Sequence, residues 1–463
     1  MGNHLGFVTS GAFLIIFAAA LIALQIVNGL QATTRPQHDK VVVCYVSSWA
    51  IYRPGNGRFG FDELQAEHCT HLVYAFAGLN ASTSSIRSID PWADLEEGGA
   101  KGGYKRMTEL RNKHPGLKVT IAIGGWNEGS ANYSELAASP QRRQTFVNSA
   151  VDFVRKYNFD GLDLDWEFPT QRGGAPHDKE NFVLLAKDLS TAFRSRGLLL
   201  TAALGAGIAT INAAYDVARL SEYLDYIHVM AYDYHGAWNM KVLSNAPLGR
   251  AADQLSVEDS IQHLLKLGAP RRKLVLGLPT YGRTFVLTSL LSGANDSPIG
   301  AEAMSTGFQG PYTRENGFMG YNEICSELVK EKNGWRTGWD KASGTAWAVK
   351  GDKAITFDNP NSMMMKADYA AEMKLAGVMV WSIDTDDFLG TCANINAEKL
   401  DPLLGLDYPL MRSINFALSR APSSHDSNDN LVPDDVEPPI PDSGLQASLS
   451  SVILIISLVS SLC

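Results

Sequence analysis

Short apolar runs alternate along the chain with longer stretches in which apolar residues recur at helical spacing. Eight such runs lie between Lys40 and Asp384 and are rich in Val, Ile, Leu and aromatic residues. Several are almost continuously apolar, as expected of strands that are covered on both faces, and the stretches between them are typical of amphipathic helices. We predict strands at Val41–Val46, Leu72–Ala77, Val119–Gly124, Gly161–Asp165, Leu198–Leu204, Tyr226–Tyr232, Leu274–Pro279 and Val378–Ser382, and helices at Arg142–Lys156, Asp178–Arg196 and Val257–Leu267.

Strands that alternate with helices in this way predict an α/β fold, specifically a (β/α)8 TIM barrel over residues 40–420. The seventh interval is abnormally long. It runs from Arg283 to about Pro360 and holds aromatic residues, glycines and a cysteine. Because so much chain is unusual for a bare loop, we predict a small α+β insertion subdomain at about 284–360, between strand 7 and helix 7.

Both ends of the chain have the composition of processing signals. The apolar run Ala12–Leu24 predicts a secretory signal peptide at residues 1–32, with an uncleaved anchor as the alternative. Residues 421–442 are rich in Pro, Ser, Asn and Asp, which predicts a flexible acidic stalk. Residues 443–463 combine small residues, a polar spacer and a short apolar tail, the pattern of a glycosylphosphatidylinositol (GPI) anchor signal. A hydrophobic tail without function is the alternative.

The overall composition excludes some classes of function. The net charge is −9 and Lys and Arg form no blocks, so we do not expect nucleic acid as a partner. Hydrophobic residues make up 45% of the chain, which is enough for a large core. The ten His residues show no metal-ligand spacing, and we predict neither a metal nor a cofactor.

Three acidic residues alternate with apolar ones in the fourth predicted strand and just beyond it. Because residues two apart in a strand share a face, Asp163, Asp165 and Glu167 project to the same side. Three acids on the inner face of a barrel strand are costly unless they share protons or hydrogen bonds. The series ends at the carboxyl end of its strand, where barrel enzymes place their chemistry, so it predicts a catalytic centre. The alternative, an exposed acidic edge strand, fits poorly with the apolar residues in between.

Residues 159–169 read FDGLDLDWEFP, which closely resembles the signature of glycoside hydrolase family eighteen. The resemblance extends over roughly Val41 to Asp407. In the family's order it includes Cys69-Thr70-His71-Leu72, Gly124-Gly125-Trp126, Met230-Ala231-Tyr232-Asp233, Gly282-Arg283 and Trp381-Ser382-Ile383-Asp384. Within that family the chain is most similar to arthropod chitinases without a chitin-binding module.

The resemblance implies a retaining mechanism in which the substrate's own N-acetyl oxygen is the nucleophile. Glu167 would protonate the glycosidic oxygen and later act as the base toward water. Asp165 would hydrogen-bond the acetamido N–H, Asp163 would share a proton with Asp165, and Tyr232 would donate to the acetamido oxygen. Asp160 is expected to brace the strand. The resemblance implies that a further set of residues lies along the substrate: Tyr45, Phe76, Gly125, Trp126, Met230, Asp233, Tyr281, Arg283 and Trp381. Of these, Trp381 would form the apolar floor beneath the reacting sugar.

The cysteines fit a secretory route, which permits disulfides. Four of the five lie in two sequence-local pairs, and the fifth, Cys463, lies in the apolar tail. Spacing alone does not determine connectivity, but the simplest scheme joins Cys44 to Cys69 and Cys325 to Cys392.

Together these features predict an endo-acting, monomeric chitinase that binds chitin and chitooligosaccharides. We expect it to be secreted and held to the outer face of the plasma membrane through a lipid anchor. N-glycosylation is expected at Asn80 and Asn132, which lie in predicted loops. One alternative is a chitooligosaccharide-binding, chitinase-like lectin or growth factor, although such relatives usually lack the acid at the position of Glu167. Another is an enzyme of the same family that cuts the chitobiose core of N-glycans, against which the long insertion argues.

Overall fold

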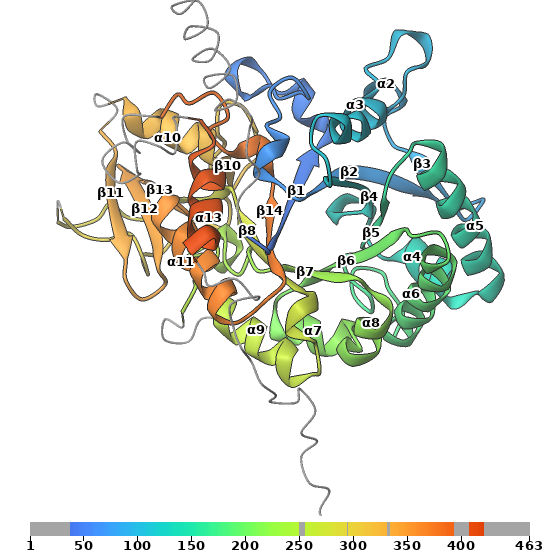
Figure 1. Ribbon diagram of the computed structural model, residues 1–463. Helices are drawn as coiled ribbons and strands as arrows, with labels where there is room; N and C mark the ends of the chain where they lie inside the picture. The colour runs from blue at the N-terminus through green and yellow to red at the C-terminus, as the bar shows by residue number, and fades with distance from the viewer. Residues whose placement is uncertain (1–37, 250–254, 294, 331–333, 393–406, 421–463) are drawn as a thin grey trace, which may run out of the picture. The chain divides into compact units, whose positions relative to one another are not determined.

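Figure 1 shows the computed structural model of the protein, which describes residues 38–249, 255–293, 295–330, 334–392 and 407–420. The chain divides into a large unit, Met1–Pro422, and a second unit, Ser423–Cys463, and every described residue belongs to the first. The signal peptide, stalk and anchor signal predicted at 1–32, 421–442 and 443–463 lie outside the described residues. Among the helices that are described, none combines the length and the apolar character needed to cross a bilayer.

Eight parallel strands form a closed barrel. They are β1 (Val41–Ser47), β2 (His71–Asn80), β4 (Lys118–Gly124), β5 (Gly161–Asp165), β6 (Leu199–Gly205), β7 (Tyr226–Met230), β8 (Leu274–Pro279) and β14 (Gly377–Trp381). Neighbours pair in the order β1-β14-β8-β7-β6-β5-β4-β2, and the pairing of β1 with β2 closes the ring (Figure 1). The predicted barrel is therefore confirmed, with strand ends that shift by at most three residues. A short strand that was not predicted, β3 (Ser85–Ser88), pairs antiparallel with the end of β2.

Helices surround the barrel and follow most of its strands. They are α2 (Pro91–Asp94), α3 (Gly103–Glu109), α4 (Ala131–Ala138), α5 (Pro140–Lys156), α6 (Asp178–Arg194), α7 (Ile208–Ala214), α8 (Val217–Tyr223), α9 (Val257–Lys266), α11 (Pro360–Glu372) and α13 (Pro409–Arg420). The start of α5 has a local cause, because the Ser139 hydroxyl accepts the N–H of Arg142 and Pro140 fits the first helical turn.

The connection from β1 to β2 departs from the regular alternation. All of it is described, and it holds the 3₁₀ turns η1 (Ser48–Tyr52), η2 (Gly55–Gly57) and η3 (Ala66–His68) in place of an α-helix. Pro54 and Gly55 interrupt this segment, and such residues favour turns over a helical period.

The long interval after β8 folds into a second sheet. Its strands are β9 (Tyr281–Val286), β10 (Phe318–Gly320), β11 (Arg336–Asp340), β12 (Thr345–Lys350) and β13 (Lys353–Phe357). They pair antiparallel in the order β10-β9-β13-β12-β11, and α10 (Tyr321–Val329) follows β10. Phe285, Trp347 and Val349 belong to a small apolar core of this insertion. The predicted α+β insertion is present, and its first strand begins directly after the barrel strand β8.

Two disulfides join segments that neighbour one another in the fold. Cys44 in β1 is bonded to Cys69 just before β2, with a Cα–Cα distance of 6.0 Å. Cys325 in α10 is bonded to Cys392 after β14, with a Cα–Cα distance of 5.7 Å. Both predicted pairs are confirmed. In the chain-entropy model each loop of this size contributes about 3–4 kcal/mol of stability.

Candidate active site

Three carboxyl groups follow one another at the carboxyl end of β5. The first residue of the strand is Gly161, where a Cβ atom would lie 2.2 Å from the backbone oxygen of Leu199 on β6, so the close approach of the two strands requires glycine. Asp163 and Asp165 are almost fully buried, with exposed fractions of 0% and 4%. Glu167 lies two residues beyond the end of the strand. The structure thus brings together the three acids that were predicted to share one face, because residues two apart in a strand project to the same side.

Asp163 is held as a carboxylate by side chains from three other barrel strands. Tyr45 of β1 donates to its Oδ2 at 2.6 Å, and Thr201 of β6 donates to its Oδ1 at 2.5 Å. The Nδ1 atom of His228 on β7 lies 3.1 Å from Oδ1. Burial alone would raise the pKa of Asp163, but His228 and the two hydroxyl donors together lower it below its ordinary value. Asp163 therefore carries a negative charge inside the barrel.

Asp165 has the opposite environment. Its Oδ1 atom is buried and has no hydrogen-bond partner among the described residues. Burial, followed by the negative charges of Glu167 and Asp163, raises the pKa of Asp165 well above its ordinary value. The surroundings of Asp165 therefore favour its protonated form, and one of its acceptor oxygens is unused. Both oxygens of Asp163 accept from other groups, so the proton sharing expected between these two acids stays a prediction.

Glu167 has a pKa that suits proton transfer near neutral pH. Burial raises the pKa of Glu167 to about 7, the negative charge of Asp233 contributes to the rise, and the positive charge of Arg172 opposes it. A carboxyl group in this range is partly protonated at neutral pH and both gives up and takes up a proton readily, as a group that serves first as acid and then as base requires.

A polar cluster at the end of β7 lies close enough to influence Glu167. The hydroxyl of Tyr232 lies 3.7 Å from the sulfur of Met379, which is a weak acceptor. Asp233 accepts from the Tyr281 hydroxyl at 2.6 Å and from Nε of Arg283 at 2.8 Å. Since Tyr281 and Arg283 belong to β9, the first strand of the insertion supplies part of the site.

Aromatic side chains gather around Trp381 at the end of β14. Phe76 stacks on Trp381 with ring centroids 5.8 Å apart, and Trp49 lies 6.1 Å from Phe76 and 6.2 Å from Trp381. Tyr45 meets Trp381 edge-on at 5.5 Å, and Met230 packs against the same inner-barrel cluster. The group therefore offers an apolar surface next to the acids.

Gly125 and Trp126 follow β4. Gly125 has φ +83°, and a Cβ atom there would lie 2.8 Å from the ring of Phe76, so the position requires glycine. Its N–H donates to the backbone oxygen of Asp165 at 2.9 Å. Trp126 is 60% exposed. This short segment therefore connects the end of β4 with the acids of β5 and presents an exposed indole beside them.

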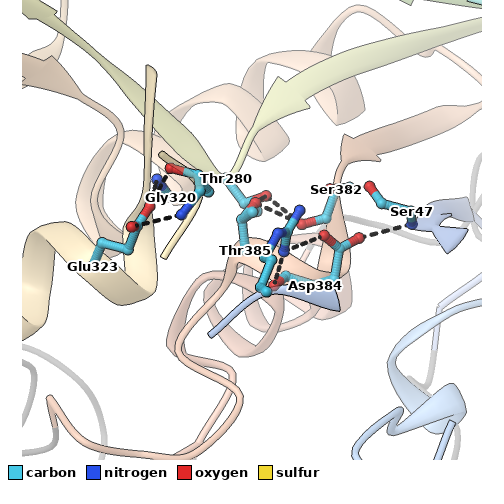
Figure 2. A network of polar contacts seen from close by, with 9 residues as sticks. Ser47, Thr280, Gly320, Glu323, Ser382, Asp384 and Thr385 are labelled. Atoms are coloured by element: carbon cyan, nitrogen blue, oxygen red, sulfur yellow. Dashed lines mark hydrogen bonds and ion pairs between the residues drawn. The ribbon is translucent and has the colours of Figure 1, made fainter. Parts of the chain in front are cut away.

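A network of polar contacts holds the backbone that follows Trp381 (Figure 2). Thr280, directly after β8, donates its hydroxyl to the backbone oxygen of Ser382 at 2.6 Å. Asp384 accepts the N–H of Ser47, the last residue of β1, at 2.9 Å. The contacts join the carboxyl ends of β1, β8 and β14, and so restrain the position of the indole that lies between them.

Asp160 lies at the other end of β5. Its carboxylate accepts the N–H of Val119 on β4 at 2.7 Å and pairs with Arg111 at 2.9 Å. These contacts join β5 to its neighbour, in keeping with the bracing role expected of Asp160.

Sequence reasoning missed His228 and Thr201, both of which contact Asp163. The signal for His228 was present, because in its strand it shares a face with Met230 and precedes Tyr232 by four residues. Thr201 gave no comparable signal, since threonine is common in strands for reasons of packing.

One group of possible metal ligands lies close together in the part of the chain that the structure describes: Cys325, Asp387 and Cys392. The two cysteines are joined in a disulfide, so neither offers a thiolate. Asp387 accepts the backbone N–H groups of Thr391 at 3.0 Å and Cys392 at 2.7 Å. These contacts give the group a structural role.

Comparisons with known proteins agree with this geometry. The family model described as Glycosyl hydrolases family 18 matches residues 41–386. The chain is 52% identical over 404 residues to probable chitinase 2 of Drosophila melanogaster. The aligned region covers 83% of this chain and 82% of that protein. The chain is 36% identical over 434 residues to the endochitinase of Manduca sexta, with coverage of 91% and 74%.

Among solved structures, the Group IV chitinase of Ostrinia furnacalis in complex with allosamidin is similar with a TM-score of 0.76 and 40% sequence identity. The match covers 83% of this chain and 100% of that one. The resemblance of residues 159–169 is thereby confirmed, and the chain belongs to glycosyl hydrolase family 18.

Proposed function

We propose that the chain is a chitinase that hydrolyses β-1,4 bonds between N-acetylglucosamine units by retaining, substrate-assisted catalysis. The observation that carries the proposal is the unequal bonding of three acids in series at the end of β5. Both oxygens of Asp163 accept hydrogen bonds, Asp165 keeps a buried oxygen without a partner among the described residues, and Glu167, with a pKa raised to about 7, follows two residues later. Most retaining glycosidases use a second carboxylate as the nucleophile. Asp165 is buried in surroundings that favour its protonated form, which makes it a poor nucleophile. The acetamido oxygen of the substrate takes that role instead.

Each group then has a part that matches its hydrogen-bonding state. Glu167 donates its proton to the glycosidic oxygen and, as a carboxylate, removes a proton from water in the second step. The unused Oδ1 of Asp165 accepts the acetamido N–H and so turns the acetamido oxygen toward the anomeric carbon. The hydroxyl of Tyr232 gives up its weak contact with Met379 and donates a hydrogen bond to the acetamido oxygen instead. Burial favours the protonated form of Asp165, and the negative charges of Glu167 and then Asp163 add to this effect.

The substrate class follows from the surfaces beside the acids. Trp381, Phe76 and the exposed Trp126 offer rings for the apolar faces of sugar units. Asp233 and Arg283 offer an acceptor and donors for hydroxyl and acetamido groups. The names of the relatives add support, because they are chitinases and one structure holds allosamidin.

Some residues expected along the substrate act through a neighbour in this proposal. Tyr45 and Tyr281 are 1% and 2% exposed, so each holds an acid, Asp163 or Asp233, in place. Gly125 leaves room for the Phe76 ring.

The competing functions of the same family are less well supported. A chitinase-like lectin dispenses with the acid, whereas here Glu167 is present with a pKa of about 7. An enzyme for the chitobiose core of N-glycans has no need of the insertion, whose strand β9 here positions Asp233 next to Glu167.

Fluorogenic chitobiose and chitotriose substrates, compared with N-glycan release from a glycoprotein, separate the three functions. We expect hydrolysis of the chitin oligosaccharides, and release of N-glycans alone, or binding without turnover, would contradict the proposal. The product profile on colloidal chitin then tests the endo-acting mode, and gel filtration tests the monomer.

We also propose that the enzyme works outside the cell. Two disulfides suit an oxidising compartment. The expectation that both glycosylation candidates lie in loops was wrong, because Asn80 is the last residue of β2 and Asn132 lies in the first turn of α4, but Asn132 is exposed. Attachment through a GPI anchor near Asp442 and Ser443 is the further proposal from the tail composition. Phosphatidylinositol-specific phospholipase C should release activity from intact expressing cells, and activity that stays bound after this treatment would contradict the anchor.

A further inference from the structure

Arg172 is a charged residue with no part in the reaction described above. It lies five residues beyond Glu167, and its backbone φ of +50° is in the left-handed region. Its guanidinium carbon lies 3.5 Å from the centroid of the Trp126 ring, which is van der Waals distance, so one face of the indole is covered. Trp126 is nevertheless 60% exposed, so its opposite face is open to solvent.

Hydrogen bonds connect the segments that carry these two side chains. The Ser130 hydroxyl donates to the backbone oxygen of Phe168 at 2.6 Å and accepts from Nε1 of Trp166 at 2.9 Å. The N–H of Ser130 donates to the backbone oxygen of Arg172 at 3.4 Å. The segment after β4, with Trp126, and the segment after β5, with Arg172, are therefore held in one arrangement.

The same guanidinium also contacts the backbone of the catalytic acid. Nη1 of Arg172 donates to the backbone oxygen of Glu167 at 3.0 Å. Its positive charge lowers the pKa of Glu167, against burial and the negative charge of Asp233. One side chain therefore touches both an exposed ring of the site and the residue that transfers the proton.

We propose that Arg172 is a positioning residue that holds the indole of Trp126 as a platform for a sugar next to the scissile bond and keeps a positive charge beside Glu167. The inference rests on the proposed function and links one of its substrate contacts to its acid. A sugar that stacks on the open face of Trp126 leaves the pair with Arg172 intact, because the guanidinium lies on the opposite face.

The groups that interact electrostatically with Glu167 come from several elements. Asp165 lies on β5, Asp233 and Tyr232 follow β7, and Tyr215 lies between α7 and α8. Of these groups and Arg172, the arginine is the one with a positive charge. Its neutralisation is therefore expected to raise the pKa of Glu167 and to move the basic limb of the kcat/KM profile to higher pH.

A pair of substitutions separates the planar stack from the charge. Arg172→Lys keeps the charge and loses the planar stack, and Arg172→Gln loses the charge. We expect both to raise KM for chitotetraose about two- to fivefold, the effect of an exposed cation–π pair, and only Arg172→Gln to shift the basic limb. Arg196→Gln is the matched control, because Arg196 is also exposed and donates to a backbone oxygen, that of Ala192, at 2.6 Å. It should change neither quantity.

Dependence on Trp126 is tested in a second background. In a Trp126→Ala enzyme, Arg172→Lys should leave KM for chitotetraose unchanged, because the ring that the guanidinium supports is gone. An equal rise of KM with and without Trp126 would overturn the positioning role. The proposal would also be overturned if Arg172→Lys kept the wild-type KM and Arg172→Gln kept the wild-type basic limb of the kcat/KM profile.

A measurement without substrate keeps the inference distinct from the proposed function. Loss of the guanidinium uncovers the second face of Trp126, so quenching of tryptophan fluorescence by acrylamide should rise in Arg172→Gln. In a Trp126→Phe background the same substitution should have no effect on quenching. A wild-type enzyme that does not cleave chitotetraose would contradict the proposed function. Equal acrylamide quenching in the wild type and in Arg172→Gln would contradict this inference alone.

Discussion

Two groups of three acids lie in short stretches of this chain, one at the carboxyl end of β5 and one directly after β14. The second group is Asp384, Asp386 and Asp387, all almost fully buried. Burial raises the pKa of Asp386 to about 7, the same value that Glu167 has in the first group. A raised pKa therefore does not by itself separate a catalytic acid from a structural one.

The two groups differ in their hydrogen-bond partners. Asp386 accepts the N–H of Leu410 at 3.3 Å and of Met411 at 3.0 Å, donors in the first turn of α13 that a helix leaves unpaired. Asp165 on β5 has a buried oxygen without a partner among the described residues. Backbone donors that saturate a buried acid make it part of the framework, whereas an acid with an unused acceptor at a strand end is available to a ligand.

Removal of the acetyl group from the sugar that Asp165 is proposed to bind has the largest expected effect. The internal nucleophile is lost with it, and well-oriented intramolecular groups are worth on the order of 10⁵-fold or more. Cleavage rates of chitotetraose and of a tetramer with glucosamine at the reacting position provide the measurement. NMR of the first product should show the β-anomer. Initial α-anomer, or efficient cleavage of the deacetylated tetramer, would rule out substrate assistance.

Substitution of Glu167 by Gln should lower kcat by at least ~10²–10⁴-fold, because the amide cannot protonate the leaving group. Binding of chitotetraose, measured by calorimetry, should persist since the amide is nearly isosteric. Asp386→Asn is the matched control from the other group of acids and should keep kcat/KM. If Glu167→Gln turns over at close to the wild-type rate, or if both variants lose activity alike, the distinction between the two groups fails.

The pH dependence of kcat/KM sharpens the comparison further. Glu167 acts in its protonated form and has a pKa of about 7, so kcat/KM should fall above pH 7 by about tenfold for each pH unit. Asp233→Asn removes a negative charge that raises this pKa, and the basic limb should therefore move to lower pH. A limb that moves with Asp386→Asn and not with Asp233→Asn would show that the wrong acid had been assigned.

The smallest effect on activity is expected for Asp386→Asn. We expect kcat/KM within about twofold of wild type and an unfolding free energy lower by about 1–3 kcal/mol. The reason is that the amide offers one acceptor oxygen where the carboxyl group offers two, so a buried backbone donor of α13 loses its partner. Chemical denaturation followed by circular dichroism measures the second quantity. Unchanged stability would show that the hydrogen bonds to α13 do not support the fold.

Much of the architecture could be predicted from local pattern. Apolar runs, several of them almost continuous, indicated the barrel strands, because strands that are covered on both faces are apolar throughout. The length of the seventh interval indicated the insertion, because so much chain is unusual for a bare loop. The connection after β1 could not be placed in the same way, since a regular alternation predicts a helix where its Pro54 and Gly55 favour turns.

The sequence by itself determined which residues of β5 share a face, and hence that Asp163, Asp165 and Glu167 act together. Which of them keeps a proton was decided by tertiary structure. Tyr45 and Thr201 reach Asp163 from positions 118 and 38 residues away in the chain. Protonation depends on burial and on charges and donors within a few ångströms, and these neighbours meet the acids only when the barrel closes.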